Sequence, residues 1–189
     1  MQDFFSNDDY KLLRKHMWEL AVEASETAKH GLSVLEVGPS LAKYTEQAFP
    51  EYSTCVLKRR CAEANINYKT LDIIPGTCDY TGTIEDLTSS LGNDKFDIIV
   101  ALGVIEHTFN IFKIPDSMCR VLNAGGRVYL NTPFLFKLHS PTPDYWRISP
   151  AAMEKLFGDL FNLTIDTYPK DQVGKNSKPL SINISGIKK

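Results

Sequence analysis

Two acids and a glycine stand where this chain could bind a nucleotide-like cofactor. Glu36 lies in the aliphatic run at residues 34–37, and Gly38 ends that run. Ser40 has the right type for the N-cap of a following helix. In an open parallel sheet, ligands collect outside the carboxyl ends of the strands, so this strand and turn could form a cofactor loop. An ordinary strand-to-helix turn has the same pattern, and the rest of the chain must separate the two interpretations.

The second acid is Asp72, near the end of a predicted strand at residues 68–73. In a nucleotide-binding unit, an acid at the end of the second strand binds the ribose hydroxyls, usually about 20 residues after the glycine turn. Asp72 lies 34 residues after Gly38. Either an insertion separates them, or residues 53–57 form the second strand. The insertion is favoured, because residues 53–57 are followed by Lys58 where a hydroxyl acceptor is needed.

The elements that must position these acids alternate between strands and helices. Residues 96–102 are almost continuously apolar, as expected of a central parallel strand covered on both faces. The predicted strands are residues 34–37, 68–73, 79–84, 96–102, 127–132, 161–168 and 179–187. The predicted helices are one between caps at residues 6–8 and Gly31, followed by residues 41–49, 60–64, 110–122 and 149–157. This alternation predicts an α/β protein.

Length, composition and charge limit the class of protein. A chain of 189 residues with 43% hydrophobic residues fits one globular domain, and it contains no internal repeat or linker. The formal net charge of −2 supplies no overall positive field, so we expect no nucleic acid partner. The basic cluster at residues 58–60 is typical of a solvated helix face.

The four cysteines predict neither a metal site nor a disulfide. They show no C-x-x-C spacing and have no histidine partners at metal-ligand intervals, so we expect reduced thiols, no metal and a cytoplasmic protein. The first residues lack the basic and apolar regions of a secretory signal. No apolar run approaches the roughly 20 residues that span a bilayer, so we also expect no membrane partner.

Four segments resemble motifs of the class I S-adenosylmethionine-dependent methyltransferases, and the resemblance extends from about residue 32 to 165. The segments are V-L-E-V-G at 34–38, L-D-I at 71–73, F-D-I-I-V at 96–100 with V-I-E-H at 104–107, and R-V-L-N-A-G-G-R at 120–127. The last two are the more specific. Residues 132–150 are similar to a bacterial, type 11-like subgroup with a D-Y-W-R segment after strand five, frequently associated with cell-surface sugars or small metabolites.

The resemblance implies a single domain over residues 1–189. Its fold would be a Rossmann-like, doubly wound, seven-stranded sheet that is mostly parallel, with one antiparallel strand near the C-terminus. Residues 1–31 would form a helical cap, and residues 133–149 a loop on the substrate side. The implied cofactor is S-adenosyl-L-methionine, and the implied reaction is methyl transfer to a small-molecule or sugar-type acceptor, with oxygen as the expected methylated atom.

The resemblance also assigns contacts to the cofactor. Glu36 would orient its amino group, and Asp72 would accept hydrogen bonds from both ribose hydroxyls. The other implied contacts are Gly38, Pro39 and Ser40 against the methionine part, Ile73 and Ile84 on either side of adenine, and Leu102, Gly103 and Val104 beside the sulfonium.

Two positions depart from the family pattern. The first loop is usually G-x-G-x-G, whereas Gly38 is followed here by Pro39 and Ser40, which predicts a stiffer loop. An acid commonly follows a glycine near the end of the third strand, but Thr83 follows Gly82. The candidates to replace that acid at the adenine amino group are Glu85 and Asp86.

Catalysis of methyl transfer mainly requires that the acceptor atom be held about 3–3.5 Å from the methyl carbon. A base helps if the acceptor is a hydroxyl, and His107 after the fourth strand and His139 after the fifth are the candidates. Asp144 could orient a base or hold a substrate hydroxyl. A structural role is the alternative for each histidine. Residues 145–147 could form a substrate wall or could anchor their loop by burying aromatic rings.

Other functions remain open at this level. A nicotinamide-dependent oxidoreductase would carry G-x-G-x-x-G, which is absent. A non-catalytic S-adenosylmethionine-binding module fits the reduced glycine content of the first loop, and an N- or C-methyltransferase of a metabolite would share the motifs. A nucleic-acid methyltransferase is disfavoured, because residues 131–134 only partly resemble the Asn/Asp-Pro-Pro-aromatic motif.

Overall fold

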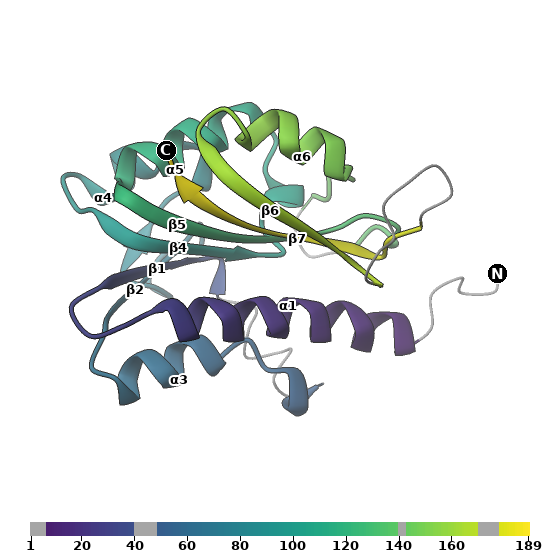
Figure 1. Cartoon of the computed structure of the whole chain (residues 1–189), viewed down its shortest axis with the longest axis horizontal. Coiled ribbons are helices and arrows are strands. Elements are labelled where there is room, and N and C mark those ends of the chain that lie inside the picture. The colour runs from purple at the N-terminus through teal and green to yellow at the C-terminus, as the bar shows by residue number, and fades with distance from the viewer. Residues whose placement is uncertain (1–6, 40–48, 140–142, 170–177) are drawn as a thin grey trace.

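A seven-stranded sheet lies between two layers of helices (Figure 1). The computed structural model describes residues 7–39, 49–139, 143–169 and 178–189. The strands are β1 (Ser33–Val37), β2 (Asn67–Asp72), β3 (Tyr80–Thr81), β4 (Phe96–Leu102), β5 (Leu122–Pro133), β6 (Phe161–Tyr168) and β7 (Ser181–Lys188). Their order across the sheet is β3-β2-β1-β4-β5-β7-β6.

The strand directions confirm the predicted sheet. Strands β1 to β5 are parallel, and β7 pairs antiparallel with both β5 and β6. Among the described strands, β7 is therefore the one antiparallel member. The strand order reverses between β1 and β4, which lie side by side. Their carboxyl ends form the switch point at which an open α/β sheet binds ligands.

Helices cover both faces of the sheet (Figure 1). The helices are α1 (Asn7–Thr27) and α3 (Val56–Glu63) on one face, and α4 (Leu87–Leu91), α5 (Ile114–Val121) and α6 (Pro150–Phe157) on the other. Successive residues of a strand point to opposite faces. In β4, Ile98 packs in the cluster that contains Leu20 of α1, whereas Ile99 packs in the cluster that contains Met118 of α5. This double burial explains the continuous apolar run at residues 96–102.

Residues 53–57 do not form a strand. Helix α3 begins at Val56, and its fully buried residues Leu57 and Cys61 lie four apart on one face, which packs with α1. The second strand is β2, which ends at Asp72 and pairs with β1, so the predicted insertion is confirmed. Residues 40–48, which include Ser40 and nearly all of the helix predicted at 41–49, lie outside the described residues.

Two other boundaries differ from the prediction. The helix expected at residues 110–122 is a 3-10 turn (Ile111–Lys113) followed by α5. Strand β5 begins at Leu122, five residues earlier than expected, because the register against β4 shifts and the extra residues are accommodated as an irregularity. Gly125 lies there with φ +69°, a conformation that favours glycine.

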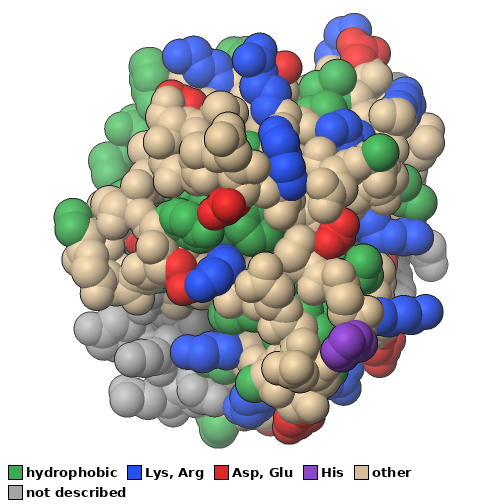
Figure 2. Space-filling model, turned by 90° about the vertical axis from the view of Figure 1, so that its left-hand side faces the viewer, with side chains coloured by type: hydrophobic (Ala, Val, Ile, Leu, Met, Phe, Trp, Pro, Cys, Tyr) green, Lys and Arg blue, Asp and Glu red, His purple; other side chains and the backbone are tan. Residues whose placement is uncertain are grey.

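The end of the molecule where the parallel strands begin carries charges of both signs. Figure 2 shows Lys and Arg side chains interspersed with Asp and Glu on this face. Charges of both signs therefore share this face. None of the helices in the described ranges is long and apolar enough to cross a membrane.

Candidate active site

Two cavities meet at the carboxyl ends of the parallel strands. The larger cavity, of about 320 Å³, lies at the ends of β1, β2 and β4, and the smaller cavity, of about 180 Å³, lies between β1, β4, β5 and α1. Both are lined by Val37, Gly38, Gly103 and His107. These four residues define the junction of the two cavities.

Gly38 packs closely against Val104 at this junction. Its φ is +77°, and a Cβ atom there would lie 2.5 Å from Cγ2 of Val104. Its amide donates to the carbonyl oxygen of Leu71 at 2.8 Å, which ties the turn after β1 to β2. Gly103 also has a positive φ, of +68°. The chain therefore requires glycine at Gly38 even though Pro39 follows it.

The larger cavity brings together the residues predicted to bind a nucleoside. Asp72 is buried at the end of β2, and its Oδ1 accepts a hydrogen bond from the Ile74 amide at 3.1 Å. Ile84 is buried and Ile73 is 57% exposed, and both line this cavity with Asp72. A carboxylate beside two apolar side chains suits a ribose and a flat base.

Glu85 and Asp86 are separated by the structure. Glu85 lines the larger cavity, and its Oε1 accepts a hydrogen bond from the Asn110 amide at 2.8 Å. Asp86 instead caps α4 by accepting from the Ser89 amide at 3.2 Å, and it does not line either cavity. Of the two proposed substitutes for the missing acid at Thr83, only Glu85 faces the cavity.

Glu36 and Arg14 line the smaller cavity from opposite elements. Glu36 is buried in β1 and accepts a short hydrogen bond from the Tyr68 hydroxyl. Burial raises the pKa of Glu36 to about 7, and the Tyr68 hydrogen bond opposes the shift only in part. Arg14 reaches the cavity from α1, and burial lowers the pKa of its guanidinium. A carboxylate and a guanidinium cation in one small cavity could bind the ammonium group and the carboxylate of an amino acid.

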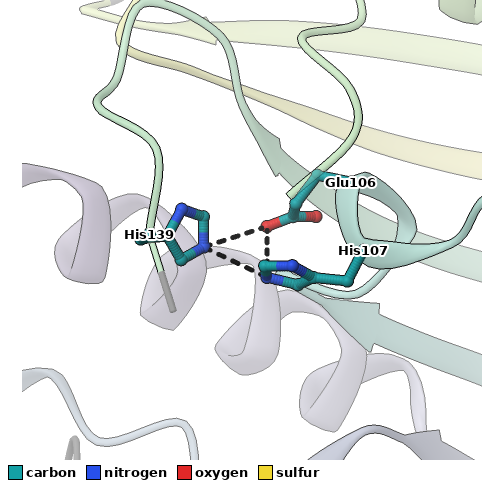
Figure 3. Close-up of side chains that lie close together, drawn as sticks. All are labelled: Glu106, His107 and His139. Carbon is teal, nitrogen blue, oxygen red and sulfur yellow. Dashed lines mark hydrogen bonds and ion pairs between the residues drawn. The ribbon is translucent and has the colours of Figure 1, made fainter. Parts of the chain in front are cut away.

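Glu106, His107 and His139 converge beside the junction (Figure 3). Glu106 and His107 lie in a 3-10 turn (Ile105–His107) soon after β4, and His139 comes from the chain after β5. The two Nε2 atoms are 3.1 Å apart, and Oε1 of Glu106 lies 3.8 Å from each. All three residues line the smaller cavity.

Glu106 is a fully buried acid. Its exposed fraction is 0%, and neither carboxylate oxygen has a hydrogen-bond partner of good geometry among the described residues. Burial raises the pKa of Glu106 to about 8, while its own main chain opposes the shift and the negative charge of Asp144 adds to it. A carboxyl group in this position costs free energy unless a donor or a cation reaches it.

Asp144 contacts His139, and Arg147 pairs with Asp144. The Oδ2 atom of Asp144 lies 2.9 Å from Nδ1 of His139 and accepts the His139 amide at 3.0 Å. Arg147 binds both oxygens of this carboxylate and donates to the carbonyl oxygens of Phe136 and Lys137. Burial would raise the pKa of Asp144, but the Arg147 and His139 hydrogen bonds outweigh it and hold the pKa below its ordinary value. Burial lowers the pKa of His139.

The remaining predicted site residues are distributed over the two cavities. Pro39 and Leu102 line the smaller one, and Val104 lines the larger one. Asp144 lines neither, so the structure places it behind His139 and away from the cavity walls. Ser40 lies outside the described residues.

The D-Y-W-R segment combines both interpretations of residues 145–147. Tyr145 lines the larger cavity and is 47% exposed. Trp146 anchors the chain, because its indole N–H donates to the carbonyl oxygen of Thr108 at 2.9 Å. Ser149 then caps α6 by accepting from the Ala152 amide. One residue of the segment therefore faces a cavity, and the others fix its position.

Sequence reasoning assigned no role to Glu106 or Arg14. The signal for Glu106 was its position directly beside a candidate base at the end of a central strand. The signal for Arg14 was a basic residue next to Leu13 and near Met17, on the apolar face of a helix. Neither signal distinguishes a cavity residue from a surface one without knowing which helix face covers the sheet.

Solved structures share this fold. A chain from the Haloferax volcanii complex between the Trm112 methyltransferase activator and a protein assigned as a methyltransferase matches with a TM-score of 0.63 and 14% identity, over 97% of this chain and 94% of that one. A S-adenosylmethionine-dependent methyltransferase from Archaeoglobus fulgidus matches with a TM-score of 0.61 and 16% identity, over 93% and 94%. The YcgJ protein of Bacillus subtilis matches with a TM-score of 0.56 and 19% identity, over 92% and 98%.

These TM-scores show a shared fold, and at identities below 20% they show the fold alone. It is the Rossmann-like fold of the S-adenosylmethionine-dependent methyltransferases. No protein-family model matches the sequence, and no curated protein matches it. The function must therefore be argued from the residues of the site.

Proposed function

We propose that this protein transfers the methyl group of S-adenosyl-L-methionine to a hydroxyl oxygen of a small-molecule or sugar-type acceptor. The observation that carries this proposal is the junction of the two cavities at Gly38, Gly103 and His107. One cavity has the residues that suit a nucleoside, and the other has acid–base residues. A methyl group at the junction would face an acceptor in the smaller cavity, as an in-line displacement requires.

The residues present fit the cofactor. Asp72 would bind the ribose hydroxyls, and Glu85 would accept from the adenine amino group. Glu36 would bind the ammonium group of the methionine part, and Arg14 its carboxylate. The positive φ of Gly38 and its close contact with Val104 fix the turn after β1, and the glycine adds no side chain to the wall of either cavity. The remaining proposed contacts are Pro39, Ser40, Ile73, Ile84, Leu102, Gly103 and Val104.

The cofactor supplies an activated methyl group on a sulfonium sulfur, so the protein has to align the acceptor and remove its proton. His107 and His139 lie where a hydroxyl in the smaller cavity would donate. Asp144, ionised by its pair with Arg147, orients His139. An amine would bring its own lone pair, whereas a hydroxyl must lose a proton, and the histidine pair therefore favours oxygen as the acceptor atom.

The smaller cavity is closed by the two segments proposed as a helical cap and a substrate-side loop. Tyr10, Leu13 and Met17 line it from the cap at residues 1–31, and Pro133 and Phe136 line it from residues 133–149. We propose that both segments belong to one methyltransferase domain over residues 1–189. This cavity would hold the methionine part of the cofactor at Glu36 and Arg14, and the reacting hydroxyl group of the acceptor at the two histidines.

The test combines cofactor binding with turnover. Calorimetry should show that the protein binds S-adenosyl-L-methionine and S-adenosylhomocysteine, and release of S-adenosylhomocysteine should occur with hydroxylated sugars and phenols in a panel of acceptors. Turnover confined to amines would redirect the proposal to nitrogen. Binding without turnover on any acceptor would support the non-catalytic module, and no binding would refute the proposal.

Cofactor affinity should fall as the pH drops below about 7. Because the pKa of Glu36 is raised to about 7, its carboxyl group is protonated below that pH in the protein without cofactor. An ammonium ligand requires the ionised carboxylate. Affinity should therefore level off about one pH unit above the pKa of Glu36 and decrease by up to about tenfold per pH unit well below it. Calorimetry between pH 5.5 and 8.5 measures this, and the Glu36→Gln variant should bind weakly without that slope. An unchanged slope in Glu36→Gln would assign the titration to another group.

A further inference from the structure

The three side chains of Figure 3 have the spacing of ligands around one metal ion. The triangle formed by His107 Nε2, His139 Nε2 and Glu106 Oε1 has sides of 3.1, 3.8 and 3.8 Å. The radius of the circle through these three points is about 2.1 Å. Zinc binds histidine nitrogen at about 2.0–2.1 Å and carboxylate oxygen at about 2.0–2.2 Å. The side chains need not move far to coordinate one ion.

The outer hydrogen bonds leave both Nε2 atoms free to act as ligands. Nδ1 of His107 lies 3.0 Å from the carbonyl oxygen of Pro143, which can only accept, so Nδ1 carries a proton. Nδ1 of His139 lies 2.9 Å from Oδ2 of Asp144 without the alignment of a good hydrogen bond, and the negative charge of this carboxylate favours a proton on Nδ1. In the neutral rings, both Nε2 lone pairs then point into a gap of 3.1 Å. Two lone pairs at this distance repel unless a proton or a cation lies between them.

Glu106 provides an independent reason for a cation. It is fully buried, and no hydrogen bond of good geometry reaches its two oxygens in the described part of the chain, although interactions with the Thr132 hydroxyl and with its own main chain lower its pKa. Arg14 also faces the cavity and interacts favourably with this carboxylate, while Asp144 repels it. An ion in contact with Glu106 would stabilise the ionised carboxylate, which burial by itself disfavours.

We propose that Glu106, His107 and His139 bind a divalent transition-metal ion of the zinc class. Two imidazoles and one carboxylate are a donor set for zinc and related ions, whereas magnesium and calcium prefer oxygen ligands throughout. Asp144 and the Pro143 carbonyl oxygen fill the outer positions that orient metal-binding histidines. This proposal departs from the sequence-based expectation of no metal.

Three protein ligands leave at least one coordination position open, and all three line the smaller cavity. The role of the ion rests on the proposed function: it would bind the acceptor hydroxyl and lower its pKa. With both Nε2 atoms bound to the ion, the histidines would hold the ion and would not accept the proton themselves. The hydroxyl proton would leave to water, the acceptor oxygen would bond to the methyl carbon, and the carbon–sulfur bond would break with its electron pair on sulfur. The products would be the methylated acceptor and S-adenosylhomocysteine.

Zinc binding is tested on the full chain without an affinity tag. Chelator-treated protein, kept reduced, is titrated with Zn²⁺ by calorimetry, and bound metal is counted by mass spectrometry after dialysis. We expect one Zn²⁺ per chain, not displaced by excess Mg²⁺. Glu106→Gln and His139→Asn should each weaken binding by at least about tenfold. The matched controls are Glu63→Gln and His30→Asn, because both residues are exposed on the surface, and these should bind as the wild type does.

Equal Zn²⁺ affinity in wild type, Glu106→Gln and His139→Asn would overturn the proposal and point to adventitious binding by thiols. Absence of stoichiometric binding in the wild type would overturn it too. Circular dichroism shows whether each variant is folded. If one of the two variants does not fold, the His107→Asn variant is measured in its place. S-adenosylhomocysteine binding is measured in parallel. A protein that binds Zn²⁺ but not S-adenosylhomocysteine would contradict only the proposed function. A protein that binds S-adenosylhomocysteine but not Zn²⁺ would contradict only the metal site.

Discussion

Asp72→Ala should weaken S-adenosyl-L-methionine binding by about 100-fold. Asp72 is buried at the end of β2 and lines the larger cavity together with Gly38 and Ile84. A carboxylate that accepts from two ribose hydroxyls makes two charge-assisted hydrogen bonds, each worth roughly 1.5–3 kcal/mol. Loss of about 3 kcal/mol corresponds to about two orders of magnitude in Kd, which calorimetry can measure.

Two controls isolate the ribose contact. Asp116→Asn removes an exposed acid of α5 that pairs with Arg120, and it should leave cofactor affinity unchanged. Adenine alone lacks the ribose, so its binding should differ little between Asp72→Ala and wild type. An affinity for S-adenosyl-L-methionine that is unchanged in a folded Asp72→Ala protein would refute the ribose assignment.

Arg147→Lys should destabilise the protein by about 3 kcal/mol, although the charge is kept. The guanidinium binds both oxygens of Asp144 and also donates to the carbonyl oxygens of Phe136, Lys137 and Trp146. An ammonium group cannot reproduce this planar set, and Asp144 would remain a buried, poorly compensated charge. For a chain of this length, the melting temperature should fall by roughly 6–12 °C.

The matched control is Arg120→Lys. Arg120 also pairs with an aspartate, Asp116, but both side chains are more than half exposed. Such a pair contributes roughly 0–1 kcal/mol, so its replacement should hardly change the melting temperature. Equal effects of Arg147→Lys and Arg120→Lys in thermal denaturation would show that the loop after β5 is not held by the Arg147 network. His139 should also lose its position in Arg147→Lys, and Zn²⁺ affinity should fall with it.

The sequence by itself determined the sheet. The double burial of Ile98 and Ile99 appears directly as a continuous apolar run, and the acid at Asp72 ends its strand as predicted. Strand periodicity is local, because alternate residues must face opposite sides of the sheet. The antiparallel strand near the C-terminus came with the family resemblance, and the pairing of β7 with β5 and β6 confirms it.

Local patterns were less informative for short elements. Residues 53–57 have a strand-like composition, yet helix α3 starts at Val56 because Leu57 and Cys61 share one buried face against α1. A segment of eight residues fits either period, and the neighbouring helix decides between them.

Only the tertiary structure brought the reactive groups together. His107 and His139 were each predicted as a base, but their 3.1 Å contact depends on the chain after β5 returning over the end of β4. Glu106 joins them because the 3-10 turn buries its side chain, and Arg14 joins the cavity because α1 covers that edge of the sheet. Whether these side chains meet depends on the paths of the loops and on the rotation of each helix about its axis. Neither of these produces a periodic pattern in the sequence.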